Sequence, residues 1–423
     1  MKSKSYRNPW LWVPSLYFAE GLPYVLVMSV SVVFYKSIGI DNATIAFYTS
    51  LLYLPWMLKP LWSPVVDLIG TKRRWIVMMQ FLGSVILILL ALAIGGSVSF
   101  ILSIVLFLIL AFLSATHDIA ADGFYMLALT GQHQSAFVGV RNMLYRIAMI
   151  TGQGALIVIA GALQQRFSNS LAWSITFFIS ALLYATLALY HSFILPLPAT
   201  DAPFRSSEQK FFRSFLHTFA SFFSRNDIYL VIAFLFFFRF AEALLVKMVP
   251  LFLLDTPEKG GLGLSMQQIG LVYGTVGVIA LVAGGLLGGY VVSIKGLRWW
   301  LWPMTLIMHV PDVVYVYLSS VLPQNIFLIA LAIALEQFGY GFGFTAYTLY
   351  MIYVSEGEHK TSNYALCTGI MALSMIVPGM ISGALQELVG YKSFFLLVLV
   401  ATIPAFIVTA LVKIPESFGR NSS

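Results

Sequence analysis

The feature that most constrains this chain is a series of long apolar runs that follow one another along the sequence. A helix needs about 20 apolar residues to cross the hydrocarbon core of a bilayer. Twelve such runs are expected, at 9–35, 43–69, 75–95, 98–126, 136–163, 171–195, 227–253, 266–292, 299–320, 324–354, 361–388 and 391–413. Since 60% of the residues are hydrophobic and only 10% are charged, a soluble exterior is excluded. The sequence therefore predicts an all-α polytopic membrane protein with 12 transmembrane helices.

The basic residues that lie between the runs are distributed unevenly. Loops on one side hold fifteen of them: Lys2, Lys4, Arg7, Lys72, Arg73, Arg74, Arg205, Lys210, Arg213, Arg225, Lys295, Arg298, Lys360, Lys413 and Arg420. Loops on the other side hold four: Lys36, Arg166, Lys259 and Lys392. Because cytoplasmic loops are enriched in Lys and Arg, both termini are expected in the cytoplasm. The formal charge of +7 is thus explained by topology, and nucleic-acid binding is disfavoured.

The residue inventory disfavours several kinds of chemistry. A single cysteine, Cys367, excludes a disulfide framework and a cysteine-based metal site. The chain has no HExxH, no GxSxG and no P-loop. We therefore expect no metal site, no cofactor and no enzymatic activity.

The two halves of the chain resemble each other. Phe18-Ala19-Glu20-Gly21-Leu22 in the first run returns as Phe240-Ala241-Glu242-Ala243-Leu244 in the seventh. The pattern predicts an N-terminal six-helix bundle over 1–196, a cytoplasmic linker over 197–227 and a C-terminal six-helix bundle over 228–423. Within the linker, aromatic residues recur at helical spacing from Phe211 to Phe223. They indicate an amphipathic helix in the membrane interface, or alternatively a linker helix packed on the bundle.

Two six-helix repeats related by an axis along the membrane normal resemble the major facilitator superfamily. The stretch from Asp67 to Arg74 is also similar to the cytoplasmic loop motif of that superfamily. The resemblance implies that Asp67, Lys72, Arg73 and Arg74 close an inward gate. Asp122 and Arg141, near the cytoplasmic ends of their spans, are assigned to the same gate.

Ionisable residues inside the predicted spans are costly and usually have a partner or a water-filled cavity beside them. The acids are Glu20, Asp118, Asp122, Glu242, Asp312 and Glu336. The cations are Lys59, Arg141, Arg146, Arg239 and Lys247. We expect the first group to supply proton coupling through Glu20, Glu242, Glu336 and Asp118. We expect Arg146, Arg239, Lys247 and Lys59 to hold an anionic substrate.

A structural alternative remains open for these charges. Asp118, Asp122, Lys59 and Arg141 could be ion pairs that fix helix packing. Arg239 and Glu242, three residues apart, could neutralise each other. His117 and His309 could relay protons or simply fill space as hydrogen-bonded side chains.

Several runs, in order along the chain, resemble the AmpG muropeptide permease family, which is related to the acetyl-coenzyme A transporters. They are Leu54–Pro64, Ser114–Asp122, Tyr145–Met149, Glu336 with Gly341, Gly343, Thr345 and Ala346, and Asn363–Leu366. The resemblance implies import of anhydro-muropeptides across the bacterial inner membrane, driven by protons. It marks Lys59, Asp118, Asp122, Arg146 and Glu336 as candidate functional positions. Glu20 and the pair Tyr125-Met126 depart from the family pattern.

The sequence thus predicts a monomeric, proton-coupled transporter that imports an anionic, amino-sugar-containing peptidoglycan fragment by alternating access. The alternatives are transport of another organic anion, such as an acetyl-CoA-like nucleotide, and drug efflux. A non-transporting membrane sensor or enzyme is the remaining class.

Overall fold

The computed structural model describes residues 7–95, 99–198, 201, 220–356, 360–416 and 418–419. Its regular elements are all helical within those residues. Ten helical segments are long and apolar enough to cross a membrane. The expected second span is present in addition as two shorter helices, and one segment of 49 residues, Asn363–Leu411, contains the expected eleventh and twelfth spans. The predicted fold class and the multi-pass membrane character are confirmed.

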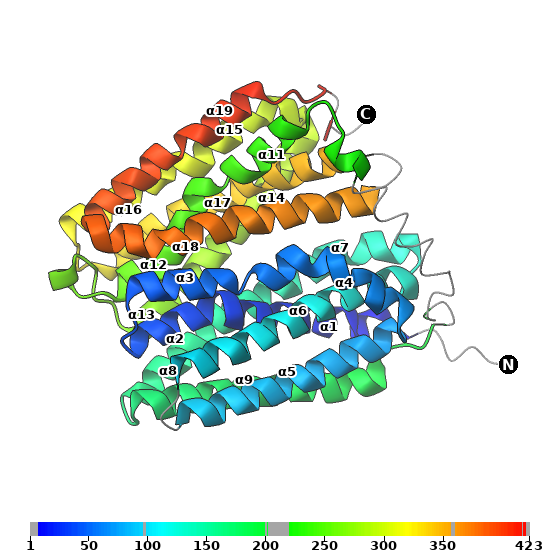
Figure 1. Cartoon of the computed structure of the whole chain (residues 1–423), viewed down its shortest axis with the longest axis horizontal. Coiled ribbons are helices and arrows are strands. Elements are labelled where there is room, and N and C mark those ends of the chain that lie inside the picture. Colours follow the sequence, from blue (N-terminus) through cyan, green and yellow to red (C-terminus); the bar gives the residue numbers. More distant parts are fainter. Residues whose placement is uncertain are drawn as a thin grey trace. The chain divides into compact units, whose positions relative to one another are not determined.

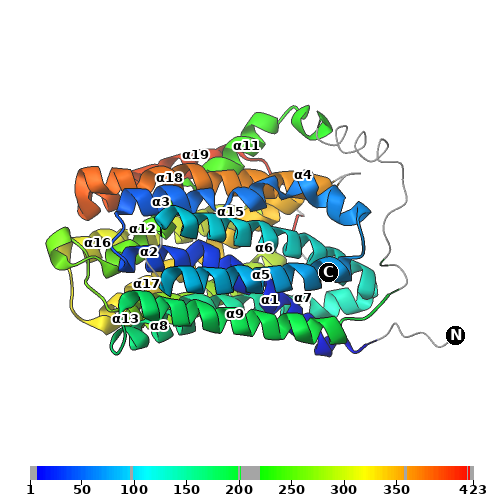
Figure 2. The same cartoon turned by 60° about the horizontal axis from the view of Figure 1, so that its bottom comes forward.

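The elements of the first half run as follows: α1 Val13–Val25, η2 Leu26–Val30, α2 Ser31–Ser37, α3 Asn42–Leu51, α4 Leu54–Leu68, α5 Lys72–Gly95, α6 Phe100–Ala128, α7 Gly131–Met149, η3 Ile150–Leu156, α8 Ile157–Gln164 and α9 Asn169–Ile194. Figure 2 shows α5 between α6 and α9, and α5 packs against both.

The elements of the second half are α11 Ile228–Phe237, α12 Phe240–Leu254, α13 Met266–Leu271, η5 Val272–Gly277, α14 Val278–Lys295, α15 Leu297–His309, η6 Val310–Asp312, α16 Val313–Val321, α17 Ile326–Ser355, α18 Lys360–Ala401 and α19 Ile403–Leu411. The backbone of α18 turns at Gly390, where φ is +75°. A positive φ suits glycine because it has no Cβ, so this residue separates the eleventh span from the twelfth.

By their internal contacts the residues form two compact units. The first comprises Met1–Ile38 and Leu58–Ser207, and the second comprises Gly39–Met57 and Glu208–Ser423. Each has its own apolar core, around Trp12 and Phe124 in the first and around Phe234 and Tyr347 in the second. The outer part of the expected second span therefore belongs with the second unit, which the sequence repeat did not predict.

Helix α3 joins the second unit by packing against α18, beside which it lies in Figure 1. A Cβ on Gly383 would lie 2.1 Å from the carbonyl oxygen of Asn42, so only glycine permits this approach. Hydrogen bonds add to the contact: the Asn42 amide donates to Gln386 Oε1 at 2.7 Å, and Tyr391 OH donates to Asp255 Oδ2 at 2.6 Å.

Five spans change their helical geometry partway in the described part of the chain. Spans one, five and eight each contain a stretch of π-helix, η2, η3 and η5. Span seven breaks between α11 and α12 at Phe238 and Arg239, and span nine narrows to a 3₁₀ turn, η6, at Pro311. Such interruptions are common at functional sites, where they redirect backbone and side chains. Most of the predicted amphipathic segment from Phe211 to Phe223 lies outside the described residues, which resume at residue 220.

Candidate functional site

In the first unit, three acids from two helices lie close together. Glu20 on α1 and Asp118 and Asp122 on α6 place one carboxylate oxygen each within 4.8 Å of the others. Asp118 and Asp122 are four residues apart, so one face of α6 presents both toward α1. Glu20 Oε2 has no hydrogen-bond partner among the residues that the structure describes.

Two cations offset this charge. Lys59 Nζ on α4 lies 2.5 Å from Asp118 Oδ2, and Arg141 Nη2 on α7 lies 3.0 Å from Asp122 Oδ1. Tyr17 OH also donates to Asp122 Oδ1 at 3.1 Å, and the Arg141 guanidinium lies 4.6 Å from the centre of the Tyr17 ring. These four charges thus form ion pairs, as the structural alternative predicts. Three acids against two cations leave one negative charge over, and among the described residues Glu20 is the acid without a paired cation.

A chain of hydrogen bonds runs beside this cluster. Ser15 Oγ lies 2.9 Å from His191 Nε2, His191 Nδ1 lies 2.9 Å from Gln80 Oε1, and Gln80 Nε2 lies 2.8 Å from His117 Nε2. The amide of Gln80 must donate to His117, which places the proton of a neutral His117 on Nδ1. Because an amide does not readily pass protons on, this geometry favours a structural role for His117.

Three of the predicted gate residues, Lys72, Arg73 and Arg74, lie where α5 begins. Arg73 donates through Nε to Leu195 O at 3.3 Å and through Nη2 to Ser192 O. Asp201, which the sequence analysis did not single out, accepts hydrogen bonds from the backbone N–H groups of Lys72 at 2.7 Å and Arg73 at 3.1 Å. Asp201 thereby caps the N-terminus of α5. The only sign of this role in the sequence was that aspartate is a common helix-capping residue. Arg74 is exposed, and the side chain of Asp67 is outside the described set.

Arg146 differs from the other cations of the first unit. Its side chain is half-buried on α7 and makes a weak contact with Met149 Sδ at 3.9 Å. No ion pair involves it among the described residues. A guanidinium without an ion-pair partner has N–H donors available for an anion.

In the second unit, another three acids come together from three elements. Glu242 on α12, Asp312 on η6 and Glu336 on α17 place one carboxylate oxygen each within 4.8 Å of the others, and all three are fully buried. Tyr315 OH donates to Glu336 Oε2 at 2.8 Å, and Gln337 Nε2 donates to the same oxygen at 3.0 Å. The sequence analysis listed Asp312 among the buried acids but assigned it no role.

The second unit also has two buried cations without an acidic partner among its described residues. Arg239 donates to Tyr340 OH, and its guanidinium lies 4.8 Å from the centre of the Phe344 ring. Lys247 Nζ donates to Thr49 Oγ1 at 3.0 Å. Arg239 and Glu242, which the sequence left open as a mutually neutralising pair, form no hydrogen bond in the described residues: the break before α12 turns Arg239 toward the aromatic rings of α17, and both Glu242 oxygens remain without a donor.

His309 holds its ring in a defined orientation. Its Nε2 lies 3.1 Å from the carbonyl oxygen of Phe238, so this nitrogen carries a proton. Its Nδ1 faces Asp312 Oδ2 at 3.8 Å. His309 therefore belongs to the acid cluster of the second unit.

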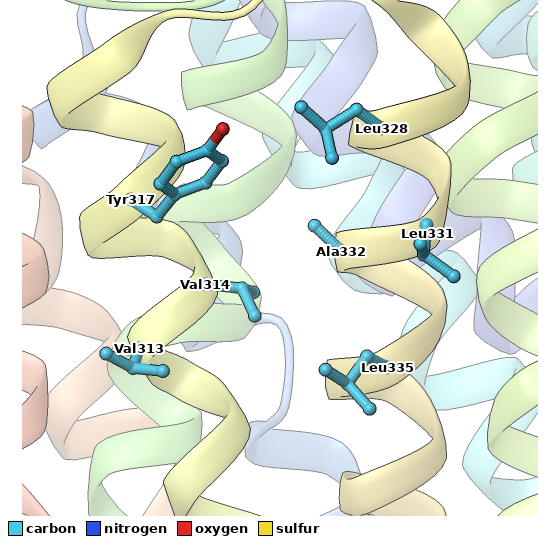
Figure 3. Close-up of a pocket in the computed structure, with 7 residues that line it drawn as sticks. All are labelled: Val313, Val314, Tyr317, Leu328, Leu331, Ala332 and Leu335. Carbon is cyan, nitrogen blue, oxygen red and sulfur yellow. The ribbon is translucent and has the colours of Figure 1, made fainter.

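A groove between α16 and α17 is of a different kind. It has a volume of about 290 Å³ and is lined by Val313, Val314, Tyr317, Leu328, Leu331, Ala332 and Leu335. Figure 3 shows these side chains facing one another across the space between the two helices. An apolar lining of this kind suits hydrocarbon and cannot recognise a charged cargo.

Comparisons with known proteins agree with the fold. Residues 15–257 match the family model described as Major Facilitator Superfamily. The putative transporter AmpG 4 of Rickettsia conorii is 25% identical over 402 residues, which cover 92% of this chain and 92% of the relative. The anhydromuropeptide permease of Escherichia coli strain K12 is 23% identical over 399 residues, which cover 92% of this chain and 77% of the relative.

Solved structures show the same fold. The crystal structure of the nucleoside transporter NupG superposes with a TM-score of 0.70 at 15% identity, covering 97% of this chain and 100% of that one. A POT family transporter in complex with 5-aminolevulinic acid gives 0.70 at 10% identity, covering 94% and 95%. At these identities the likeness concerns the fold alone.

Proposed function

Because this chain belongs to the Major Facilitator Superfamily, it is a secondary transporter and not an enzyme, and we propose that its cargo is an anhydro-muropeptide-like peptidoglycan fragment imported with protons. Transport in such proteins proceeds by alternating exposure of a site to the two sides of the membrane. The proposed location is the bacterial inner membrane with both termini in the cytoplasm, and the monomer is proposed as the working unit.

The observation that carries the cargo proposal is a set of cations without acidic partners. Arg146 in the first unit and Arg239 and Lys247 in the second have no carboxylate within ion-pair distance among the described residues. An unpaired cation in a membrane is expensive, so such groups are retained where a ligand supplies the opposite charge. Lys59, the fourth cation predicted to bind substrate, is already paired with Asp118.

Aromatic rings around Arg239 extend this argument to the sugar part of the cargo. Tyr340, Phe344 and Tyr347 each have their ring centre within 5.7 Å of the guanidinium. Aromatic faces pack well against the apolar faces of a sugar, and Tyr hydroxyls offer hydrogen bonds. The curated relatives named as AmpG transporters and as an anhydromuropeptide permease support the same class of cargo.

Proton coupling is proposed for Glu20 and Asp118 in the first unit and for Glu242 and Glu336 in the second. Glu20 is the strongest candidate of the four, since two cations offset only two of the three acids around it. The third charge is avoided when a proton occupies the cluster. The proposed cycle takes up that proton from one side of the membrane and releases it to the other.

The test is uptake of labelled anhydro-muropeptide into proteoliposomes under an inwardly directed proton gradient. Glu20→Gln fixes this position in a neutral state, so gradient-driven accumulation should disappear while exchange of external for internal cargo persists. Glu258→Gln, at a fully exposed acid, is the matched control and should accumulate cargo normally. Loss of both accumulation and exchange in a folded Glu20→Gln protein would refute the coupling role.

A second variant tests the cargo contact. Arg146→Gln removes a charged donor, and hydrogen bonds to charged groups contribute about 1.5–3 kcal/mol. The apparent affinity for the cargo should therefore fall at least about tenfold. Arg166→Gln, at an exposed arginine in a loop, should leave the affinity unchanged. Equal affinities in the two variants would remove Arg146 from the proposed binding site.

A further inference from the structure

The acid cluster of the second unit has no ion-paired lysine or arginine among the described residues, whereas the acid cluster of the first unit has two such cations. Glu20 and Glu242 occupy equivalent places in the repeated sequence Phe-Ala-Glu. Around Glu20, Lys59 and Arg141 pair with the two neighbouring aspartates. Around Glu242, no lysine or arginine pairs with any of the three acids in the described part of the chain.

Several oxygens of this cluster also lack hydrogen-bond donors. Both carboxylate oxygens of Glu242 and both of Asp312 are buried without a donor among the described residues, and the side chains of both acids are at least 99% buried. A buried carboxylate with no donor loses its hydration without any replacement. The Nδ1 atom of His309 faces the same space, 3.8 Å from Asp312 Oδ2. No lysine or arginine offsets these charges among the described residues, so a bound cation or protons must supply the missing positive charge.

The backbone around the cluster is fixed in a way that suits ion binding. Pro311 has no N–H, so it cannot donate a hydrogen bond to the carbonyl of Ile307 one turn earlier. A Cβ on Gly339 would lie 2.2 Å from that carbonyl oxygen, so α17 can approach the break in span nine only through a glycine. Broken helices in transporters hold cations with their interrupted ends. The break places Asp312 beside Glu336, and Glu336 lies one turn before Gly339 on α17.

The oxygens lie close enough together to share one ion. One oxygen from each acid lies within 4.8 Å of the other two. Hard cations such as calcium bind oxygen ligands at about 2.3–2.6 Å, so three oxygens this close can contact one ion together. Tyr315 and Gln337 both donate to Glu336 Oε2 and hold that carboxylate in place. The cations held at the interrupted helices of secondary transporters are sodium ions or protons, so sodium is the metal ion that this site favours.

We propose that Glu242, Asp312 and Glu336 form a sodium-binding site within the second unit. The three carboxylates, which come from α12, η6 and α17, supply the ligands, and Tyr315 and Gln337 orient Glu336. The sequence analysis expected no metal site, because it found a single cysteine and no HExxH motif and assigned no role to Asp312. The inference goes beyond the proposed function, because it adds sodium binding to the proton coupling proposed for Glu242 and Glu336, and it is tested by ion binding and not by transport.

The test measures thermal unfolding of the purified full-length chain in detergent at pH 8. Sodium chloride is titrated against choline chloride at constant ionic strength, with potassium chloride and calcium chloride as separate arms. We expect a saturable rise of the unfolding midpoint with sodium, because an ion that binds only the folded state stabilises it. The half-saturating sodium concentration should rise at least tenfold in Asp312→Asn. Asp255→Asn, at a buried acid that is hydrogen-bonded to Tyr391, is the matched control and should respond like the native chain.

Each result has a defined meaning. An equal response to sodium, potassium and choline would overturn the site, and a response to calcium alone would overturn its assignment to sodium. Native half-saturation in a folded Asp312→Asn protein would overturn the ligand set. If Asp312→Asn does not fold, Glu242→Gln is measured by the same criteria. Sodium binding without muropeptide uptake would leave this inference standing and refute the proposed cargo, whereas proton-driven uptake without sodium binding would do the reverse.

Discussion

Gly383→Ala tests the packing of α3 against α18 most sharply. The added Cβ would lie 2.1 Å from the carbonyl oxygen of Asn42, 2.5 Å from its carbonyl carbon and 2.7 Å from the Cα of Ala43. Ordinary contacts between such atoms are about 3.5–4.0 Å, so the two helices must separate by roughly 1 Å or more. All three atoms belong to the backbone, so no side-chain rotation can relieve the overlap.

The expected cost follows from two contributions. Overpacking a well-packed interior destabilises a protein by about 1–3 kcal/mol. Separating the helices also stretches the hydrogen bonds of the Asn42 amide, which now lie at 2.7 Å to Gln386 and 2.9 Å to Tyr391. Losing one of them adds about 1 kcal/mol. We therefore expect Gly383→Ala to lower the free energy of unfolding by about 2–4 kcal/mol.

Gly289→Ala provides the matched control. A Cβ on Gly289, on α14, meets nothing within 4 Å, and alanine is favoured over glycine inside a helix by roughly 0.5–1 kcal/mol. The assay is the free energy of unfolding of the purified protein in mixed micelles titrated with a denaturing detergent. Gly289→Ala should be neutral or slightly stabilising. If the two variants had equal stability, the close approach of α3 and α18 would be refuted.

Two further predictions concern charged pairs. Lys59→Met and Asp118→Asn should each destabilise the protein by about 2–4 kcal/mol, because each leaves one charge of a largely buried pair uncompensated. The double variant should lose less stability than the sum of the two single variants. Additive losses in the unfolding assay would contradict the pairing. Arg225 donates to Asp227 at 3.0 and 3.2 Å and holds the pKa of that carboxyl below its usual range. Stability from this pair is therefore present at neutral pH and is lost as the pH falls below about 4 through the lowered pKa. Asp227→Asn should be slightly less stable than the native chain at pH 7, and this difference should shrink as the pH is lowered below about 4. A difference that grows on acidification would refute the pairing.

Hydropathy was sufficient to locate the spans because a bilayer imposes one length on every crossing helix. The expected runs 75–95 and 171–195 correspond to α5, Lys72–Gly95, and α9, Asn169–Ile194. The assignment of residues 39–57 to the second unit was not predicted, because the alignment of repeats carries no information about which neighbour a helix contacts. The glycines of α18 were the available signal, since close approach requires them.

The candidate site was predicted in its residue types but not in its pairings. Sequence position showed that Glu20 and Glu242 are buried acids in equivalent spans. It could not show that Lys59 reaches Asp118, nor that Arg239 turns away from Glu242, because these depend on helix rotation and on the break in span seven. Asp312 was the clearest omission. Its proline neighbour signalled an interrupted helix, and interrupted helices often line ion sites in transporters.

The central claim is that this chain accumulates an anionic muropeptide at the expense of a proton gradient. The most direct measurement is the ratio of labelled anhydro-muropeptide inside proteoliposomes to that outside, with an inward proton gradient and again after an ionophore has collapsed it. The account predicts a ratio well above one that returns to one with the ionophore. A ratio of one under both conditions, with protein that is folded and inserted, would contradict it.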